Sequence, residues 1–298
     1  MRRMKRVLVT GAAGLIGSSA VDALLQAGHQ VISLDRELPA TRIGARNVIA
    51  DLLDDDSGTV LRSLEIDTVV HCAALTPASF YGDDASRVAN LNAVMDERIV
   101  SFCRDADLRL FYLSGTSLYG TEGHPWYEQS PLCPPGPYAG QKAAGERLCS
   151  GNSRFVIFRI SSPYGPRQQK ASVLSTFIRR AMRGEDLLYR GSGSRTQDFV
   201  SVKDVGQAMR MALENEDVRG VFNIASGQPI SMKGLALLVL EMVGATGSTV
   251  RSSGEPDTQE GYRAVICIEK AKRILDWSPS LSLAEGIREW LNARENAF

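Results

Sequence analysis

The sequence VLVTGAAGLIGSSAVDALLQAG, residues 7–28, contains the clearest structural signal in the chain. Its first four residues form a short apolar run rich in β-branched side chains, which is typical of a buried strand. Apolar residues at helical spacing then predict a helix over residues 16–27. Gly28 follows this helix at the position where a glycine commonly ends one. The stretch therefore predicts a strand, a tight turn and a helix, which is the repeating unit of α/β folds.

The turn between this strand and this helix carries three glycines with the spacing G-x-x-G-x-x-G. A bound pyrophosphate needs backbone N–H groups and the positive end of a helix dipole, and side chains on the turn would hold it away. The spacing is one residue longer than the G-x-G-x-x-G pattern of dinucleotide-binding folds, and an ordinary tight turn is the alternative interpretation. The residues predicted to contact the cofactor here are Gly11, Gly14, Leu15, Ile16 and Gly17.

Asp35 closes a second apolar run, residues 31–34, about 20 residues beyond the glycines. At this place in a dinucleotide-binding fold, a carboxylate accepts hydrogen bonds from the adenosine ribose hydroxyls. Because a carboxylate repels a 2′-phosphate, Asp35 favours NAD over NADP as the cofactor. Arg36 is a further candidate contact and weakens this preference, because a guanidinium accommodates a 2′-phosphate. A carboxylate in an ordinary turn is the alternative interpretation of Asp35.

Apolar runs and amphipathic segments continue to alternate along the chain, which predicts parallel strands joined by right-handed helical crossovers. The expected fold class is α/β, a Rossmann-like doubly wound parallel sheet with a smaller mixed α/β domain. We expect the NAD-binding sheet domain at residues 1–165 and a mainly substrate-binding domain at 166–298, with residues 195–230 returning to the sheet. Further strands are expected at 68–72, 108–114 and 155–160, and further helices at 88–103, 139–149, 173–182, 205–213 and 282–291.

The composition is that of an ordinary globular protein. The 298 residues include 34 Lys or Arg and 34 Asp or Glu, so the formal net charge is zero. This balance disfavours a nucleic acid or an anionic membrane as a partner. Five scattered cysteines and three histidines predict neither disulfides nor a metal site. The longest apolar stretch, residues 235–243, contains Glu241 and falls far short of a membrane span. We therefore expect a cytoplasmic protein without a metal.

Tyr138 and Lys142 stand four residues apart at the start of the helix expected over residues 139–149. This spacing places the phenol and the ammonium on one face of the helix, within reach of a common ligand. A phenol is a poor base at neutral pH, but a nearby ammonium favours the phenolate form. The pair is therefore a candidate for general base catalysis. A pair of surface side chains is the alternative interpretation, and the preceding glycine-rich turn weakens it.

Further motifs accompany these features along almost the whole chain. They are Asp51-Leu52, HCAA at 71–74, Asn90, SGTSLYG at 114–120, Arg159, YGPR at 164–167, DFVSVKD at 198–204 and Asn223. With these motifs the sequence resembles the extended short-chain dehydrogenase/reductases, the family of NAD-dependent nucleotide-sugar epimerases and dehydratases. The resemblance implies a Rossmann-like fold, NAD as the cofactor and a sugar or nucleotide sugar as the substrate.

The resemblance also implies roles for particular residues. An Asp-Leu pair would hold the adenine, and a Cys-Ala-Ala segment would line the path of the phosphates and ribose. Lys142 would also bind the nicotinamide ribose. The helices expected at 88–103 and 139–149 resemble the pair that forms a homodimer interface in this family. The implied cofactor contacts beyond the glycine turn are Asp51, Leu52, Cys72, Ala73, Ala74 and Asn90, together with Tyr138 and Lys142.

The segment 114–120 departs from the family pattern, because Gly115 stands where the family usually has a hydroxyl. We infer that Thr116 supplies the hydroxyl that binds the reacting oxygen, with Ser114 and Ser117 as alternatives. Family dehydratases carry Asp-Glu beside that hydroxyl, whereas this chain has Thr116 and Ser117. Elimination of water by that route is therefore not expected. The predicted catalytic residues are Thr116, Tyr138 and Lys142.

The predicted reaction is a hydride transfer in which Tyr138 removes the proton of a substrate hydroxyl while the hydride passes to NAD. Return of the hydride to the other face of the ketone gives an epimerase, and release of the ketone gives a sugar or sugar-acid dehydrogenase. A non-catalytic NAD-binding regulator on the same fold is a third interpretation. Guanidinium groups suit phosphate or carboxylate, so late arginines are candidate anchors, with surface salt bridges as the alternative. The candidate substrate contacts are Thr76, Ser117, Arg167, Arg195 and Arg263.

Overall fold

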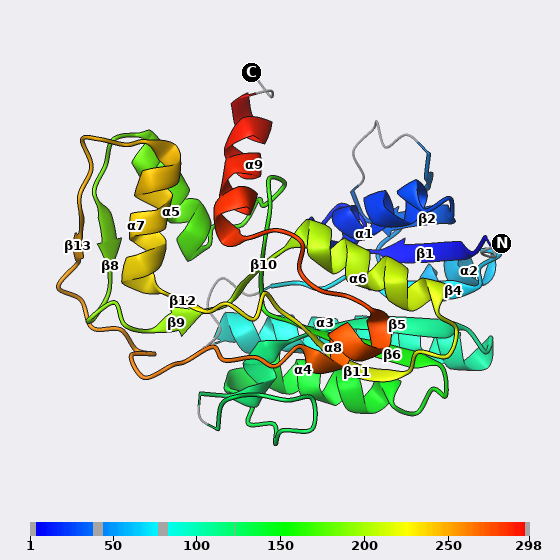
Figure 1. Cartoon of the computed structure of the whole chain (residues 1–298). Coiled ribbons are helices and arrows are strands. Elements are labelled where there is room, and N and C mark those ends of the chain that lie inside the picture. Colours follow the sequence, from blue (N-terminus) through cyan, green and yellow to red (C-terminus); the bar gives the residue numbers. More distant parts are fainter. Residues whose placement is uncertain (1–3, 38–43, 77–82, 122, 296–298) are drawn as a thin grey trace.

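Seven parallel strands form the central sheet in the computed structural model of the chain, which describes residues 4–37, 44–76, 83–121 and 123–295 (Figure 1). The strand order is β11-β6-β5-β4-β1-β2-β3. The chain runs from β1 outward to β3, crosses back to β4 beside β1, and then runs outward to the other edge. The strands are β1 (Arg6–Thr10), β2 (Gln30–Asp35), β3 (Arg46–Ile49), β4 (Thr68–His71), β5 (Arg109–Gly115), β6 (Phe155–Ile160) and β11 (Gly220–Ile224).

Helices cover both faces of this sheet (Figure 1). Neighbouring side chains of a strand point to opposite faces, so Val7 and Val9 pack in the core under the first helix layer, while Leu8 packs in the core under the second. Both faces of the sheet are therefore buried, as in other doubly wound folds. The first layer contains α1 (Leu15–Gln26), α6 (Val202–Glu214) and α8 (Glu269–Leu275), and the second contains α2 (Ser57–Arg62), α3 (Asp83–Asp105) and α4 (Gly136–Cys149).

Small residues let α1 and α6 approach each other closely. A Cβ on Gly206 would lie 2.8 Å from the backbone oxygen of Ser19, which is closer than real Cβ contacts. The Ser19 hydroxyl donates a hydrogen bond of 2.6 Å to the backbone oxygen of Val202, the first residue of α6. Through these contacts α6 fixes the direction of α1. The first turn of α1 lies at the carboxyl-terminal edge of the sheet, where the strands end.

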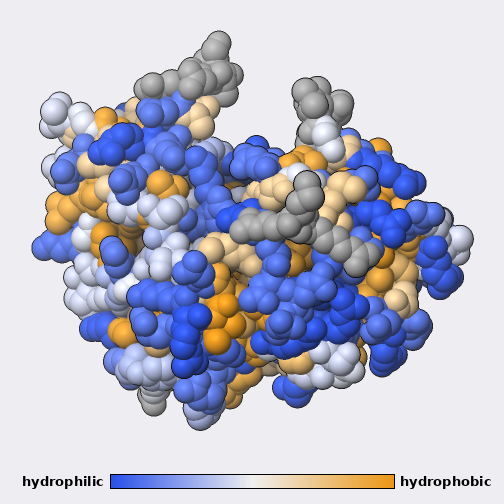
Figure 2. Space-filling view, turned by 45° about the vertical axis from the view of Figure 1, so that its right-hand side comes forward, coloured by the Kyte–Doolittle hydropathy of each residue, from blue (hydrophilic) through white to orange (hydrophobic). Residues whose placement is uncertain are grey.

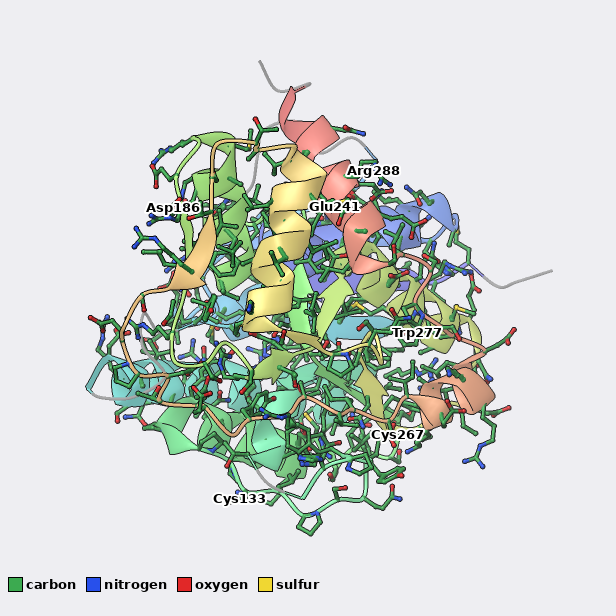
Figure 3. All side chains as sticks on the ribbon, turned by 60° about the vertical axis from the view of Figure 1, so that its left-hand side comes forward. Cys133, Asp186, Glu241, Cys267, Trp277 and Arg288 are labelled. Carbon is green, nitrogen blue, oxygen red and sulfur yellow. The ribbon has the colours of Figure 1, made fainter. Side chains whose placement is uncertain are left out.

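The smaller part of the chain is built around α5 (Val173–Met182), α7 (Met232–Val243) and α9 (Leu283–Glu295). Their apolar faces share one core, and Trp290 of α9 is fully buried in it. Glu241 and Arg288 mark α7 and α9 in Figure 3, where the two helices run side by side. Two short strand pairs accompany these helices: β8 (Leu187–Tyr189) with β13 (Val250–Ser252), and β9 (Thr196–Gln197) with β12 (Ile230–Ser231).

Residues 195–230 divide between these two parts. α6 packs against α1, and β11 joins the central sheet in parallel beside β6. The strands β9, β10 (Phe199–Ser201) and β12 lie outside the central sheet, and β10 pairs with β7 (Ser162–Tyr164). The segment therefore connects the sheet to the smaller part rather than belonging to one of them.

The apolar stretch at 235–243 forms most of α7, where the sequence pattern predicted no helix. Every residue of the stretch except Glu241 is apolar, so little helical period is visible in the sequence, and Leu237 on its outer face is 51% exposed. The Ser231 hydroxyl accepts the Gly234 N–H at the start of this helix, and Gly244 with φ of +70° ends it. Among the described residues, no helix combines the length and apolarity needed to cross a membrane. The visible surface is mostly hydrophilic, with apolar residues in separate patches (Figure 2).

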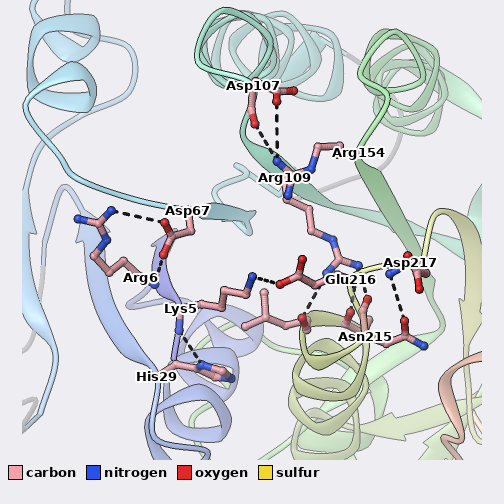
Figure 4. A network of polar contacts seen from close by, with 12 residues as sticks. Lys5, Arg6, His29, Asp67, Asp107, Arg109, Arg154, Asn215, Glu216 and Asp217 are labelled. Atoms are coloured by element: carbon pink, nitrogen blue, oxygen red, sulfur yellow. Dashed lines mark hydrogen bonds and ion pairs between the residues drawn. The ribbon is translucent and has the colours of Figure 1, made fainter. Parts of the chain in front are cut away.

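One buried guanidinium holds the carboxyl-terminal end of α6 (Figure 4). Arg109, the first residue of β5, is 2% exposed. A cation at this end of a helix satisfies the last carbonyl groups and interacts favourably with the helix dipole. Burial lowers the pKa of Arg109 to about 10, so the group remains charged at neutral pH. It donates hydrogen bonds of 2.9–3.2 Å to the backbone oxygens of Ala212, Leu213, Asn215 and Val218.

Replacing Arg109 by Met should lower the free energy of unfolding by roughly 2–4 kcal/mol, because four carbonyl oxygens, three of them in buried hydrogen bonds, lose their donor. Urea unfolding followed by circular dichroism measures this change. Arg104→Met is the control: its side chain is 59% exposed, and its loss should change the stability by less than about 0.5 kcal/mol. Equal losses in the two variants would contradict the capping role of Arg109.

Candidate functional site

The residues predicted to bind the cofactor lie where the strands end, along the carboxyl-terminal edge of the sheet. Gly11 follows β1, Asp35 ends β2, Cys72 follows β4 and Thr116 follows β5. The connections from β1 and β4 run to opposite halves of the sheet, and doubly wound sheets open a ligand-binding crevice at such a point. The fold therefore brings four separate regions of the sequence to one edge.

The turn after β1 crosses the loop after β4 at a distance that only glycine permits. Gly11 has φ of +65°, and a Cβ there would lie 2.6 Å from the backbone N and Cα of Ala73. A Cβ on Gly17 would lie 2.1 Å from the backbone oxygen of Gly11. The Thr10 hydroxyl accepts a hydrogen bond of 3.3 Å from the Ala73 N–H across the same crossing. Packing therefore requires the first and last glycines of the turn, whatever ligand binds there.

The start of α1 offers the donors that a dinucleotide needs. Gly14 is exposed at the N-cap position, and within this described turn α1 has neither a side-chain cap nor an acidic residue. The Asp35 carboxylate lies beside it and accepts hydrogen bonds from the backbone N–H groups of Ala13 at 2.9 Å and Arg36 at 2.8 Å. Free helix N–H groups suit a pyrophosphate, and the carboxylate suits ribose hydroxyls. The residues present therefore fit NAD.

Asp51 and Leu52, which the resemblance assigns to the adenine, form a rigid turn beyond β3. The Asp51 carboxylate accepts the Leu53 N–H at 2.9 Å. Leu52 is 3% exposed, and its backbone oxygen accepts a hydrogen bond of 2.7 Å from Arg98 of α3. The turn is thus held in place by the protein itself, and its contact with adenine stays a prediction.

Two asparagines of α3 differ in their surroundings. Asn90, predicted to contact the cofactor, is exposed. Asn92 is 1% exposed and clamps Leu75, whose N–H it accepts at 2.8 Å and whose backbone oxygen it contacts at 2.9 Å. Asn92 therefore fixes the loop after β4, on which Ala74 and Thr76 are exposed. The sequence pattern did not predict this role, although Asn92 stands at helical spacing from the apolar residues of this helix.

Lys142 is buried beside β5 and the residue that follows β4, while Tyr138 is half-buried on the first turn of α4. The Lys142 ammonium lies 4.8 Å from the centre of the Tyr112 ring on β5, a cation–π contact. Its charge also acts on Cys72 after β4: burial raises the pKa of that thiol to about 12, against the opposing effect of Lys142. The predicted ammonium therefore lies at the edge where the cofactor residues gather.

A buried network anchors α4 to the sheet. Arg159 of β6 donates to both carboxylate oxygens of Glu146 on α4, with the shortest N···O distance 2.7 Å. It also donates to the Tyr119 hydroxyl at 2.9 Å, and that hydroxyl donates to Asn223 of β11 at 2.6 Å. Tyr119 ends the short 3₁₀ helix η1 (Thr116–Tyr119), so the network positions Thr116 relative to α4.

Three hydroxyls flank the end of β5. Thr116 is 6% exposed, and Ser117 is exposed. Ser114 is 8% exposed, and its Oγ is buried without a hydrogen-bond partner among the described atoms. A Cβ added to Gly115 would lie 3.5 Å from the Ser117 Oγ, so this hydroxyl is close to the space that a side chain at Gly115 would occupy. The choice between these hydroxyls stays a prediction.

The arginines predicted to anchor the substrate all form hydrogen bonds or ion pairs with other residues of the chain. Arg167 forms an exposed ion pair with Asp22 of α1 at 2.6 Å. Arg195 is better buried and donates to Asp257 at 2.7 Å. Arg263 donates to two backbone oxygens within three residues of itself. Of these three, the Arg195–Asp257 pair is the most enclosed, and the anchoring roles stay predictions.

A buried carboxylate beside the site was not expected. Asp96 of α3 is 2% exposed and accepts hydrogen bonds from Tyr112 and from Gln141, the residue before Lys142. Its signal in the sequence was an acidic residue beside the apolar positions Met95 and Ile99 of a predicted helix.

The chain is similar to known proteins over nearly its whole length. A model of the NAD dependent epimerase/dehydratase family matches residues 7–225. The chain is 33% identical to the UDP-glucose 4-epimerase of Mycolicibacterium smegmatis over 303 residues, which cover 95% of this chain and 96% of that protein. It also resembles two solved UDP-glucose 4-epimerases, one from Thermus thermophilus with NAD (TM-score 0.86, 28% identity, 98% and 100% of the chains) and one from Thermotoga maritima with UDP-glucose (0.87, 26%, 98% and 99%). The chain therefore belongs to the NAD dependent epimerase/dehydratase family.

Proposed function

We propose that this chain is an NAD-dependent epimerase that inverts the C4 hydroxyl of a UDP-hexose. The relative with 33% identity is a UDP-glucose 4-epimerase, and the two proteins match over nearly their whole lengths. The two solved structures with the same fold bind NAD and UDP-glucose, respectively. This match includes the smaller part of the chain, which we predict to bind mainly the substrate. It therefore supports a related substrate as well as a related cofactor.

The observation that carries the proposal is the burial of Lys142 at the cofactor edge. Lys142 as a whole is 6% exposed, so its ammonium is largely removed from water, and a surface salt-bridge role does not account for it. Tyr138 precedes it by one helical turn and is only half-buried. A half-buried phenol one helical turn from a buried cation is the arrangement that a proton-accepting tyrosine needs.

In the proposed reaction, Tyr138 accepts the proton of the substrate C4 hydroxyl at its phenolate oxygen. Lys142 stabilises the phenolate, and Thr116 donates a hydrogen bond to the oxygen as it becomes a ketone, with Ser114 and Ser117 as the alternative donors. When bound, NAD supplies a hydride acceptor that can return the hydride to either face of this ketone. Tyr138 then returns its proton to the oxygen, so the cycle ends with no net change of the cofactor.

Incubation with UDP-glucose or UDP-galactose tests this function. NMR spectroscopy of the sugar should show the C4 epimer, while the absorbance of NADH stays constant after the first turnover. Accumulating NADH would instead identify the sugar dehydrogenase, since a released ketone leaves the cofactor reduced. NAD binding without turnover of UDP-sugars would favour the regulatory protein.

Tyr138→Phe should lower kcat by about 10²- to 10⁴-fold, because the general base is lost while the ring remains. The dissociation constant of NAD should change by less than about threefold, since the hydroxyl is one of many cofactor contacts. Tyr127→Phe is the matched control, because Tyr127 is 42% exposed. Retention of more than a tenth of the turnover in Tyr138→Phe would exclude the proposed base.

Gly115→Ser tests the hydroxyl at the end of β5. Gly115 has the ordinary extended dihedrals φ −138° and ψ 154°, and a Cβ there meets nothing closer than 3.5 Å, so the serine should be tolerated. Thr116→Val should lower kcat by about 10- to 100-fold, and adding Gly115→Ser should recover most of that loss. Ser117→Ala, measured in parallel, should have little effect. If Ser117→Ala lowers kcat and Thr116→Val does not, the catalytic hydroxyl is that of Ser117.

We also propose a homodimer formed by α3 and α4. Val94 of α3 and Leu148 of α4 are 40% and 37% exposed, which leaves apolar surface on the two helices named by the family resemblance. Val94→Glu combined with Leu148→Glu should therefore convert a dimer to a monomer in light scattering. Ile274→Glu is the control, because Ile274 is equally exposed on α8 in the other helix layer. A monomeric unmodified protein would end this proposal.

A further inference from the structure

Asp96 connects α3 and α4 of the second helix layer to two strands of the sheet. One carboxylate oxygen accepts hydrogen bonds of 2.6 Å from the Tyr112 hydroxyl of β5 and from the Gln141 amide of α4. The other lies 3.2 Å from Nε2 of His71, at the end of β4. Gly145 is required for this packing, since a Cβ there would lie 2.1 Å from the Tyr112 hydroxyl and 2.5 Å from the carboxylate. The carboxylate is thus built into the closest approach of α4 to the sheet.

The network continues to the nucleotide-binding turn. Nδ1 of His71 lies 2.8 Å from the Thr10 hydroxyl, and that hydroxyl accepts the Ala73 N–H. With Nε2–H donating to Asp96, Nδ1 accepts the Thr10 proton, so every hydrogen bond has one donor and one acceptor. A continuous chain of buried polar groups therefore joins the crossing of the two cofactor loops to α4.

The Asp96 carboxyl is ionised at neutral pH. Burial opposes ionisation, but the hydrogen bond from His71, the positive charge of Lys142 and the hydrogen bond from Tyr112 outweigh it and lower the pKa of Asp96. Burial and the Asp96 charge together raise the pKa of Tyr112, so its phenol remains a hydrogen-bond donor. A fixed negative charge thus lies at the hydroxyl of the tyrosine whose ring Lys142 covers.

Lys142 and Asp96 form no direct ion pair within the described part of the chain. The Tyr112 ring lies under the ammonium, and its hydroxyl contacts the carboxylate. The carboxylate therefore attracts the ammonium from a distance without using its three N–H donors, which remain for a ligand at the edge of the site.

We propose that Asp96 is a positioning residue, which holds Lys142 at the cofactor site through Tyr112 and Gln141 and through its own buried charge. This inference rests on the proposed contact of Lys142 with NAD. It predicts that the affinity for NAD depends on Asp96, a residue with no contact to the cofactor of its own, and that this dependence requires Lys142.

A double-mutant cycle in the dissociation constant of NAD tests the proposal, measured by calorimetry on protein stripped of nucleotide. Asp96→Asn keeps the size of the side chain and should weaken NAD binding about tenfold. Glu97→Gln removes the same charge from the next, exposed residue of α3 and should change the binding by less than about twofold. In a Lys142→Met background, Asp96→Asn should have almost no further effect.

The proposal would be overturned if the double variant raised the dissociation constant of NAD by the product of the two single effects. That result would show that Asp96 acts independently of Lys142. Should Asp96→Asn not fold, Tyr112→Phe replaces it in the same cycle. This variant keeps the ring under Lys142 and loses only the hydrogen bond to the carboxylate; it should weaken NAD binding a few-fold, again only when Lys142 is present. Because the readout is NAD binding, a failure to turn over UDP-sugars would count against the proposed function and leave this test intact.

Discussion

The structure depends on the crossing of two backbones, where the turn after β1 passes the loop after β4 at Gly11 and Ala73. This contact exists because β1 and β4 are neighbours in a parallel sheet whose connections run in opposite directions. It exposes the start of α1 to a ligand, and it brings the loop that begins with Cys72 to the same place. The Thr10 hydroxyl bonds to both the loop and His71, so the crossing is also the first member of the buried polar network.

Buried charges hold the helices in their positions around this crossing. Arg109 caps the end of α6, and the Arg159–Glu146 pair and Asp96 both hold α4. A buried charge without partners costs several kcal/mol, so each of these groups tolerates few arrangements of its neighbours. Apolar packing constrains the helices by shape, and each buried charge adds partners that must lie in particular directions. The charged groups therefore add the precision that places Tyr138 and Lys142 at the edge of the site.

Periodic features of the sequence predicted the order of strands and helices well, because the strands are β-branched runs and most helices have one apolar face. α7 escaped this reasoning, since apolar residues dominate its sequence and leave little visible period. Roles that depend on distant partners also escaped it. The pairing of Arg167 with Asp22, and that of Asp96 with Tyr112 and Gln141, join residues whose proximity only the folded chain creates. The glycine turn and Asp35 were predictable because their spacing along the chain is itself the signal.

The position of Asp96 reconciles two opposing requirements on Lys142. A buried ammonium needs a compensating charge, because a cation–π contact alone offsets only part of the lost hydration. A carboxylate in direct contact would supply that charge, but it would also occupy the N–H donors that a cofactor needs. The carboxylate contacts the Tyr112 hydroxyl while the ammonium lies over the face of the same ring, so the charge acts over a longer distance in a dry interior, where screening is weak. The ammonium is thereby stabilised in the protein, and within the described part of the chain no hydrogen bond to this carboxylate occupies its donors.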